Sequence, residues 1–161
     1  MPPRVVSLPW PCPNAEYEAR FGAAVAQARA DGVTALAFGD LFLADVRAYR
    51  ERQLAGTGVG PLFPLWDNSA DTPALSQAML AAGVRATITC LDPRHLIREW
   101  AGREWSDGLP AGVDPCGENG EFHTFCHAGP MFARPVTVVR GEVVERGGFV
   151  FADLLLTEEP C

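Results

Sequence analysis

The sequence contains no lysine, since all 13 of its basic residues are arginine, and its formal net charge is -7 over 161 residues. Without lysine, the chain has neither the usual Schiff-base nucleophile nor the usual lysine ligand for a nucleotide phosphate. An anion site must therefore use arginine or backbone N–H groups. A net acidic surface repels nucleic-acid backbones and anionic lipid headgroups, so neither is expected as a partner.

The sequence also lacks a CxxC pair and a long apolar run, and we expect no signal peptide. Its five cysteines form an odd set, for which a reduced cytoplasm is the simplest location. No apolar run approaches the roughly 20 residues that span a bilayer, so no membrane association is expected. Cys116, His123, Cys126 and His127 lie close together, but their spacing does not match structural zinc patterns, and we expect no metal site.

The N-terminal part of the chain alternates between β-type runs and helical patterns. The predicted strands are residues 4–8, 33–38, 62–66 and 85–90, and the predicted helices are residues 16–30, 43–55, 72–82 and 93–101. Asn14 is a candidate N-cap of the first helix. The 33–38 run is apolar without alternation, which is typical of a strand buried on both faces. Such alternation predicts an α/β fold with a mainly parallel sheet.

After Ala101 the composition changes to a long loop rich in glycine and proline. Two β-type runs follow, at residues 136–144 and 148–155, and the short polar segment between them predicts a terminal hairpin. The sequence therefore predicts an α/β domain over residues 1–101. Residues 102–161 are predicted to form a loop and a small β-rich extension packed on it.

The pair Gly39 and Asp40 closes one predicted strand. Ligands of open α/β sheets bind at the carboxyl ends of the strands, where glycine lets a ligand approach and a carboxylate can orient a ribose. The alternative is that Asp40 is a helix N-cap. In the next helix, Arg47 and Glu51 share a face, which suits either a salt-bridged solvated surface or, near Asp40, a phosphate site.

The segment GENGEFHTF places acids and an imidazole on a glycine-rich turn. Glu118, Glu121 and His123 lie beside Gly117 and Gly120, whose backbones adopt unusual dihedral angles easily. Such a cluster is a candidate for general acid–base work or for binding a cationic substrate. An ordinary acidic surface turn is the alternative interpretation.

Taken in order, the segments LPWPCPNAEYE, AFGDLFLADVRAYRERQLAGTGVGPLFPLW, ITCLDPRHL and DPCGENGEFHTF resemble the diphthine ammonia ligase family. The resemblance extends from about residue 5 to residue 135. This family belongs to the N-type ATP pyrophosphatases, so the resemblance implies a Rossmann-like sheet of the adenine nucleotide alpha-hydrolase type. It also implies a ligase reaction in which ATP adenylylates a carboxylate, ammonia displaces AMP, and an amide and pyrophosphate result.

The resemblance assigns residues to ligands but no residue to catalysis. ATP, with Mg²⁺, would lie against Gly39, Asp40 and Arg47, and the substrate would lie against Glu118, Gly120, Glu121, His123 and Thr124. The acceptor is a small-molecule or protein-borne carboxylate. In eukaryotic and archaeal members it is diphthine, whose quaternary ammonium suits neighbouring carboxylates.

Two departures from the family pattern qualify these expectations. The family motif more often reads EGGEFET, so Asn119 and His123 differ and leave the acceptor open. The strand and Ser-Gly-Gly-Lys-Asp-Ser loop that wrap the ATP phosphates have no counterpart here, which predicts a shortened chain with impaired catalysis. A non-catalytic ligand-binding remnant is the alternative. Because the missing strand is central in the family, the 4–8 strand would lack a neighbour, and its exposed edge would favour either association between copies or instability.

Overall fold

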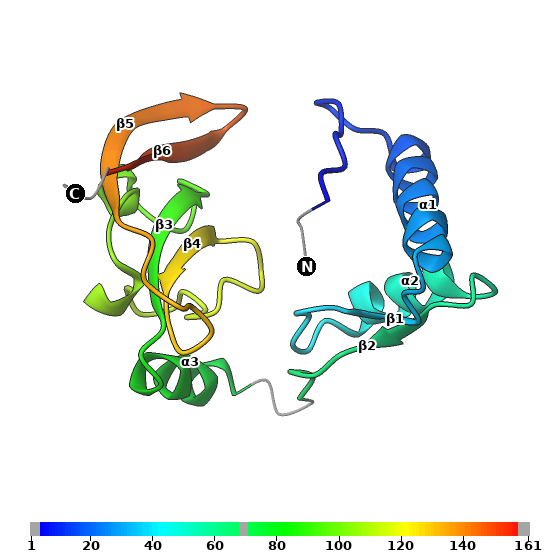
Figure 1. Cartoon of the computed structure of the whole chain (residues 1–161). Coiled ribbons are helices and arrows are strands. Elements are labelled where there is room, and N and C mark those ends of the chain that lie inside the picture. The colour runs from blue at the N-terminus through cyan, green and yellow to red at the C-terminus, as the bar shows by residue number, and fades with distance from the viewer. Residues whose placement is uncertain (1–3, 68–70, 158–161) are drawn as a thin grey trace. The chain divides into compact units, whose positions relative to one another are not determined.

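The computed structural model describes residues 4–67 and 71–157, and the chain divides into two compact units, Met1–Ala70 and Asp71–Cys161 (Figure 1). The division lies before the third helix, whereas the sequence placed it after Ala101. The structure is a mixed α/β fold with one parallel pair of strands and one antiparallel sheet. Within the described ranges, no helix combines the length and apolar character needed to cross a bilayer.

The first unit consists of helices α1 (Asn14–Ala30) and α2 (Ala44–Leu54) and strands β1 (Ala35–Ala37) and β2 (Gly60–Leu62). The two strands are parallel, with Leu36 opposite Pro61, and α2 connects them (Figure 1). Both predicted helices are confirmed, and so is parallel pairing between these two strands. The unit buries Val25, Leu54 and Val59 in a small core.

Several predictions for the first unit are wrong. Residues 4–8 form no strand, and Val5 is 88% exposed, because among the described residues no strand pairs with this segment. β1 covers only the middle of the 33–38 run and is half-buried or exposed, so it is not buried on both faces. β2 ends at Leu62, where the predicted 62–66 strand was to begin. Asn14 lies inside α1, whose N-cap is Pro13.

Over residues 71–157, the second unit contains one helix, two short 3-10 turns and a four-stranded sheet. Its elements are α3 (Thr72–Ala81), β3 (Arg85–Leu91), η1 (Arg98–Trp100), η2 (Trp105–Asp107), β4 (Phe122–Ala128), β5 (Val138–Arg146) and β6 (Phe149–Leu156). The sheet order is β4-β3-β6-β5, with every pair antiparallel (Figure 1). The predicted third helix and terminal hairpin are confirmed. The core is built on Ile88, Leu91 and Val150, together with Leu96.

The prediction of a mainly parallel sheet is wrong for β3, which pairs antiparallel with β4 and β6. The predicted helix at residues 93–101 does not form and leaves only η1, because Asp92 instead closes a turn. The carbonyl of Asp92 accepts hydrogen bonds from the N–H groups of His95 and Leu96. A parallel crossover usually contains a helix, whereas the chain between β3 and β4 forms only 3-10 turns and loops, and the two strands pair antiparallel.

Candidate functional site

Asp40 lies three residues beyond the end of β1, and its carboxylate is paired with an arginine of α2. Asp40 Oδ2 is 3.6 Å from Arg50 Nε, and the two side chains are 15% and 24% exposed. Neither atom makes a hydrogen bond to another described residue. Since α2 begins at Ala44 with Leu43 as its N-cap, Asp40 does not cap this helix. The neighbouring Gly39 is open, because a Cβ placed there would meet no atom within 4 Å.

Arg50 is held in place by contacts from three directions. Its Nη1 donates a hydrogen bond of 2.9 Å to the Tyr17 hydroxyl, and its guanidinium lies 5.1 Å from the centre of the Phe38 ring. Together with the ion pair to Asp40, these contacts hold Arg50 against the residues that follow β1. The Arg50 guanidinium that faces Asp40 is therefore held in place by other residues of the same unit.

Arg47, which the resemblance assigned to the cofactor, contacts two aromatic rings and keeps 38% of its side chain exposed. Its guanidinium lies 4.9 Å from the Phe63 ring centre and 4.7 Å from that of Trp66. Its Nε donates a hydrogen bond of 2.9 Å to Glu51, which matches the salt-bridged helix surface considered above. Arg47 is therefore already engaged by two rings and one acid.

In the second unit, the 114–121 loop is organised by its own carboxylates. Asp114 Oδ1 accepts a hydrogen bond from the N–H of Cys116 at 3.0 Å, and Asp114 Oδ2 accepts one from Glu118 at 3.1 Å. The indole N–H of the buried Trp105 donates to the carbonyl of Pro115 at 2.7 Å. The loop is thus attached to the core of the unit by Trp105.

Glu121 is the buried centre of this loop, with only 3% of its surface exposed. Its Oε1 accepts from the N–H of Asp114 at 3.1 Å and from Asn119 Nδ2 at 3.3 Å. Its Oε2 accepts from the N–H of Asn119 at 3.1 Å. Three donors of the loop therefore surround a carboxylate that was predicted to contact substrate. Asn119, one of the two departures from the family motif, is one of its partners.

The two glycines of the loop differ in how much space surrounds them. Gly117 has φ 66° and Gly120 has φ 84°, values that favour glycine. A Cβ at Gly117 would lie 2.8 Å from the carbonyl oxygen of Phe122, whereas a Cβ at Gly120 would meet nothing within 4 Å. Gly117 therefore packs closely against the chain, and the exposed Gly120 is the one that a ligand can approach.

His123 and Thr124 lie at the start of β4 rather than in the loop. They pair with Cys90 and Ile88 of β3, and both are exposed. Adjacent strand residues point to opposite faces of a sheet, so one surface cannot collect both side chains. The half-buried Glu118 follows the Asp114 turn. Sequence analysis missed β4 because the apolar and polar residues of 122–128 do not alternate strictly.

Asp92 joins the end of β3 to the 114–121 loop. Its N–H donates to the carbonyl of Glu121 at 2.9 Å. Its carboxylate accepts hydrogen bonds from Arg94, with Nε 2.9 Å from both oxygens, and also from the N–H of Arg94. The Arg94 guanidinium and N–H lower the pKa of the Asp92 carboxyl to about 2. This stabilises the turn wherever Asp92 is ionised.

We expect Arg94→Ala to destabilise the protein in a pH-dependent way. The pKa of Asp92 lies below the unfolded value of about 3.9, so the contribution is complete above that pH and is lost as the pH falls toward about 2. Urea unfolding of both proteins should therefore differ most near neutral pH and least in acid. Arg103→Ala, which removes an arginine stacked on Trp100, should show no such trend. A difference that does not change with pH contradicts the assignment.

The cysteine and histidine residues near the loop form other contacts. Burial, assisted by Asp114 and Glu118, raises the pKa of the Cys116 thiol to about 11, so the thiol stays protonated at neutral pH. His127 Nε2 lies 3.2 Å from Glu104 Oε1, which also accepts a hydrogen bond from Thr87. Within residues 4–67 and 71–157, no three His, Cys, Asp or Glu side chains are grouped so as to hold a metal ion. Cys161 lies outside the described residues.

The predicted cofactor residues all belong to the first unit and the predicted substrate residues all belong to the second. Comparison with known proteins adds no assignment, since no protein-family model matches the chain and no curated protein matches it.

Proposed function

We propose that the chain carries the nucleoside-binding part and the acceptor loop of an ATP-dependent amide-forming ligase similar to the diphthine ammonia ligases. The proposal rests mainly on Asp40, a carboxylate beyond the carboxyl end of a parallel strand and held there by Arg50. Ligands of open α/β sheets bind at that end of the strands, and an acidic side chain there accepts hydrogen bonds from a ribose. A Rossmann-like arrangement of the adenine nucleotide alpha-hydrolase type belongs to the same proposal.

Aromatic rings beyond the ends of β1 and β2 support a nucleoside ligand. Phe38 follows β1 and stacks on Phe63, which follows β2, with ring centres 5.5 Å apart. Trp66 meets Phe63 edge to face at 6.1 Å. Aromatic side chains bind bases by stacking, because every base has a π-face. The strand ends thus place aromatic rings near a carboxylate.

The residues present fit the nucleoside of ATP but not its phosphates. The chain has no lysine, Arg47 is engaged by two rings and Glu51, and Arg50 is engaged by Asp40 and Tyr17. The described residues offer no cluster of three or more ligands for Mg²⁺. We therefore derive no phosphate-transfer step from this chain. In the proposed reaction ATP activates a carboxylate, which ammonia then converts to an amide.

On the acceptor side, Glu121 acts in the proposal as a positioning residue. Its carboxylate receives loop N–H groups, so a substrate would meet the exposed Gly120 and His123 instead. The four described cysteines are free thiols, which supports a cytoplasmic location. The acceptor remains a carboxylate on a small molecule or on a protein.

A second candidate is a non-catalytic binding module of the same family. It is favoured by the contacts of Arg47 with two rings and by the carboxylates of Asp114 and Glu121, which accept hydrogen bonds from their own loop. The two candidates differ in one reaction. A ligase releases pyrophosphate from ATP when ammonium and a suitable carboxylate are supplied, and a binding module does not.

We expect Asp40→Asn to weaken adenosine binding about tenfold, because a neutral amide replaces the carboxylate that accepts from the ribose. Isothermal titration calorimetry of adenosine measures the change. Asp45→Asn is the matched control, since Asp45 is exposed in the first turn of α2. Equal adenosine affinity in wild type and a folded Asp40→Asn variant contradicts the proposal.

A further inference from the structure

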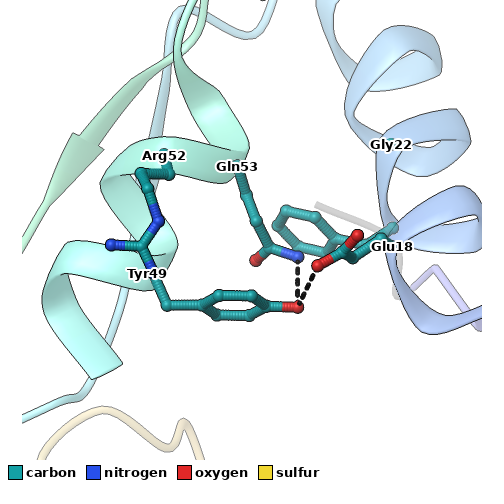
Figure 2. A pocket seen from close by; sticks show the side chains of 6 residues that line it. Glu18, Gly22, Tyr49, Arg52 and Gln53 are labelled. Carbon is teal, nitrogen blue, oxygen red and sulfur yellow. Dashed lines mark hydrogen bonds between the residues drawn. The ribbon is translucent and has the colours of Figure 1, made fainter. Parts of the chain in front are cut away.

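A cavity of about 240 Å³ lies between α1 and α2 in the first unit and has no role in the proposed ligase (Figure 2). α1 contributes Glu18, Phe21 and Gly22 to its wall, and α2 contributes Tyr49, Arg52 and Gln53. Its size suits a ligand smaller than a drug-like molecule. Both helices belong to the same compact unit.

One polar atom at this cavity has no partner. Gln53 Nε2 donates to the Tyr49 hydroxyl at 3.0 Å, and that hydroxyl lies 3.2 Å from Glu18 Oε1 (Figure 2). Gln53 Oε1 is then buried and accepts no hydrogen bond from any described residue. This oxygen has almost no solvent-accessible surface, so a ligand in the cavity does not reach it, and the charged groups open to a ligand are those of Glu18 and Arg52.

The same cavity is lined by one acid and one base that do not form an ion pair with each other. The hydrogen bonds of Glu18 with Asn14 and Tyr49 both use Oε1, which leaves Oε2 for another donor. Arg52 forms no ion pair among the described residues, and its guanidinium lies 6.0 Å from the Tyr49 ring centre. A ligand with both a positive and a negative group can pair with Glu18 and Arg52 at the same time.

We propose that this cavity binds a small zwitterion of the free α-amino acid class. The ammonium group donates to Glu18 Oε2, and the carboxylate is held by the Arg52 guanidinium. An apolar side chain of the ligand packs against the Phe21 ring. The site does not depend on ATP or on the 114–121 loop.

Gly22 provides a way to block the cavity without removing any of its polar groups. It lies within α1, and a Cβ built on it would meet no atom within 4 Å. Gly22→Leu therefore fills the cavity with a side chain and also replaces glycine by a better helix former. Ala26→Leu is the matched control, because Ala26 is exposed on the same helix and does not line the cavity.

The test is isothermal titration of the full chain with three probes of matched shape. L-leucine carries both charges, isopentylamine carries only the ammonium, and 4-methylpentanoate carries only the carboxylate. We expect L-leucine to bind one to one and each analogue to bind about tenfold more weakly, since each loses one charge-assisted contact. Binding of L-leucine should disappear in Gly22→Leu and persist in Ala26→Leu.

Variants of the charged residues that line the cavity distinguish binding at this site from nonspecific binding. Arg52→Gln should weaken L-leucine about tenfold and leave isopentylamine unchanged, whereas Arg103→Gln, at an arginine stacked on Trp100 in the second unit, should change neither. The proposal is overturned if none of the three probes binds at millimolar concentration, if isopentylamine binds as tightly as L-leucine, or if folded Gly22→Leu binds normally. Melting curves establish that each variant is folded.

Discussion

Replacing Glu121 with alanine is expected to lower the free energy of unfolding of the second unit by about 3 kcal/mol, because three donors of the loop lose a buried acceptor. The carboxylate receives two backbone N–H groups, from Asp114 and Asn119, and the side-chain amide of Asn119. The variant leaves these donors beside an apolar methyl group. Urea unfolding gives the stability change, and hydrogen exchange at the amides of Asp114 and Asn119 locates it.

Two further substitutions show whether this loss comes from the hydrogen bonds. Glu121→Gln keeps Oε1 as an acceptor but turns Oε2 into a donor facing the N–H of Asn119, so we expect a loss of about 1–2 kcal/mol. Glu99→Ala removes an exposed acid from η1 and should change stability by no more than about 0.5 kcal/mol. If Glu121→Ala is as stable as Glu99→Ala, Glu121 does not organise the loop.

In the first unit, Arg50→Ala is expected to cost about 2 kcal/mol, because it leaves the largely buried Asp40 carboxylate without its cation. The substitution also removes the hydrogen bond to Tyr17 and the contact with the Phe38 ring. Since the two charged side chains are 24% and 15% exposed, water offsets part of the cost. Hydrogen exchange across α1 and α2, measured against urea concentration, reports the stability of this unit.

Arg52→Ala is the control for Arg50→Ala, since Arg52 is exposed on the same helix and forms no ion pair among the described residues. It should change stability by less than about 0.5 kcal/mol. Arg50→Lys keeps the charge but not the planar group that reaches both Tyr17 and Phe38, and should lie between the two. Equal stability of Arg50→Ala and Arg52→Ala contradicts the role given to Arg50.

The sequence predicted the three helices and the terminal hairpin because their signals are local. α1 ends just before Gly32, which adopts φ 88°, and α3 begins at Thr72 with Asp71 accepting a hydrogen bond from the N–H of Ala74. In the hairpin, the strands are joined by Gly147 and Gly148, both with positive φ. Such features depend on a few neighbouring residues and can be recognised in the chain itself.

The antiparallel sheet of the second unit could not be predicted in the same way. β3 is a short, mostly buried run that suits either kind of sheet, and its partners β4 and β6 lie far along the chain. The missing crossover helix depends on Asp92, whose carboxylate and carbonyl close a turn instead. Local helix propensity was overruled there by a turn that the sequence pattern did not reveal.

The sequence identified the candidate site residues by their types, and the geometry of the structure then changed the roles assigned to some of them. Asp40 lies near a strand end as expected, while its ion pair with Arg50 depends on the packing of α2. Glu121 looked like a ligand for a cation because acids on glycine-rich turns are usually solvated. Its burial depends on Asn119 and on the N–H of Asp114, seven residues earlier. The motif did not indicate that Glu121 would accept hydrogen bonds from its own loop instead of contacting a ligand.

The most direct test of the proposed function compares adenosine with ATP on the same protein. If the chain holds the nucleoside but no fixed cation for the phosphates, calorimetric titration with ATP and Mg²⁺ should give an affinity within about threefold of that of adenosine. Both affinities should fall together in Asp40→Asn. ATP binding a hundredfold tighter than adenosine, or no binding of either, would contradict the account.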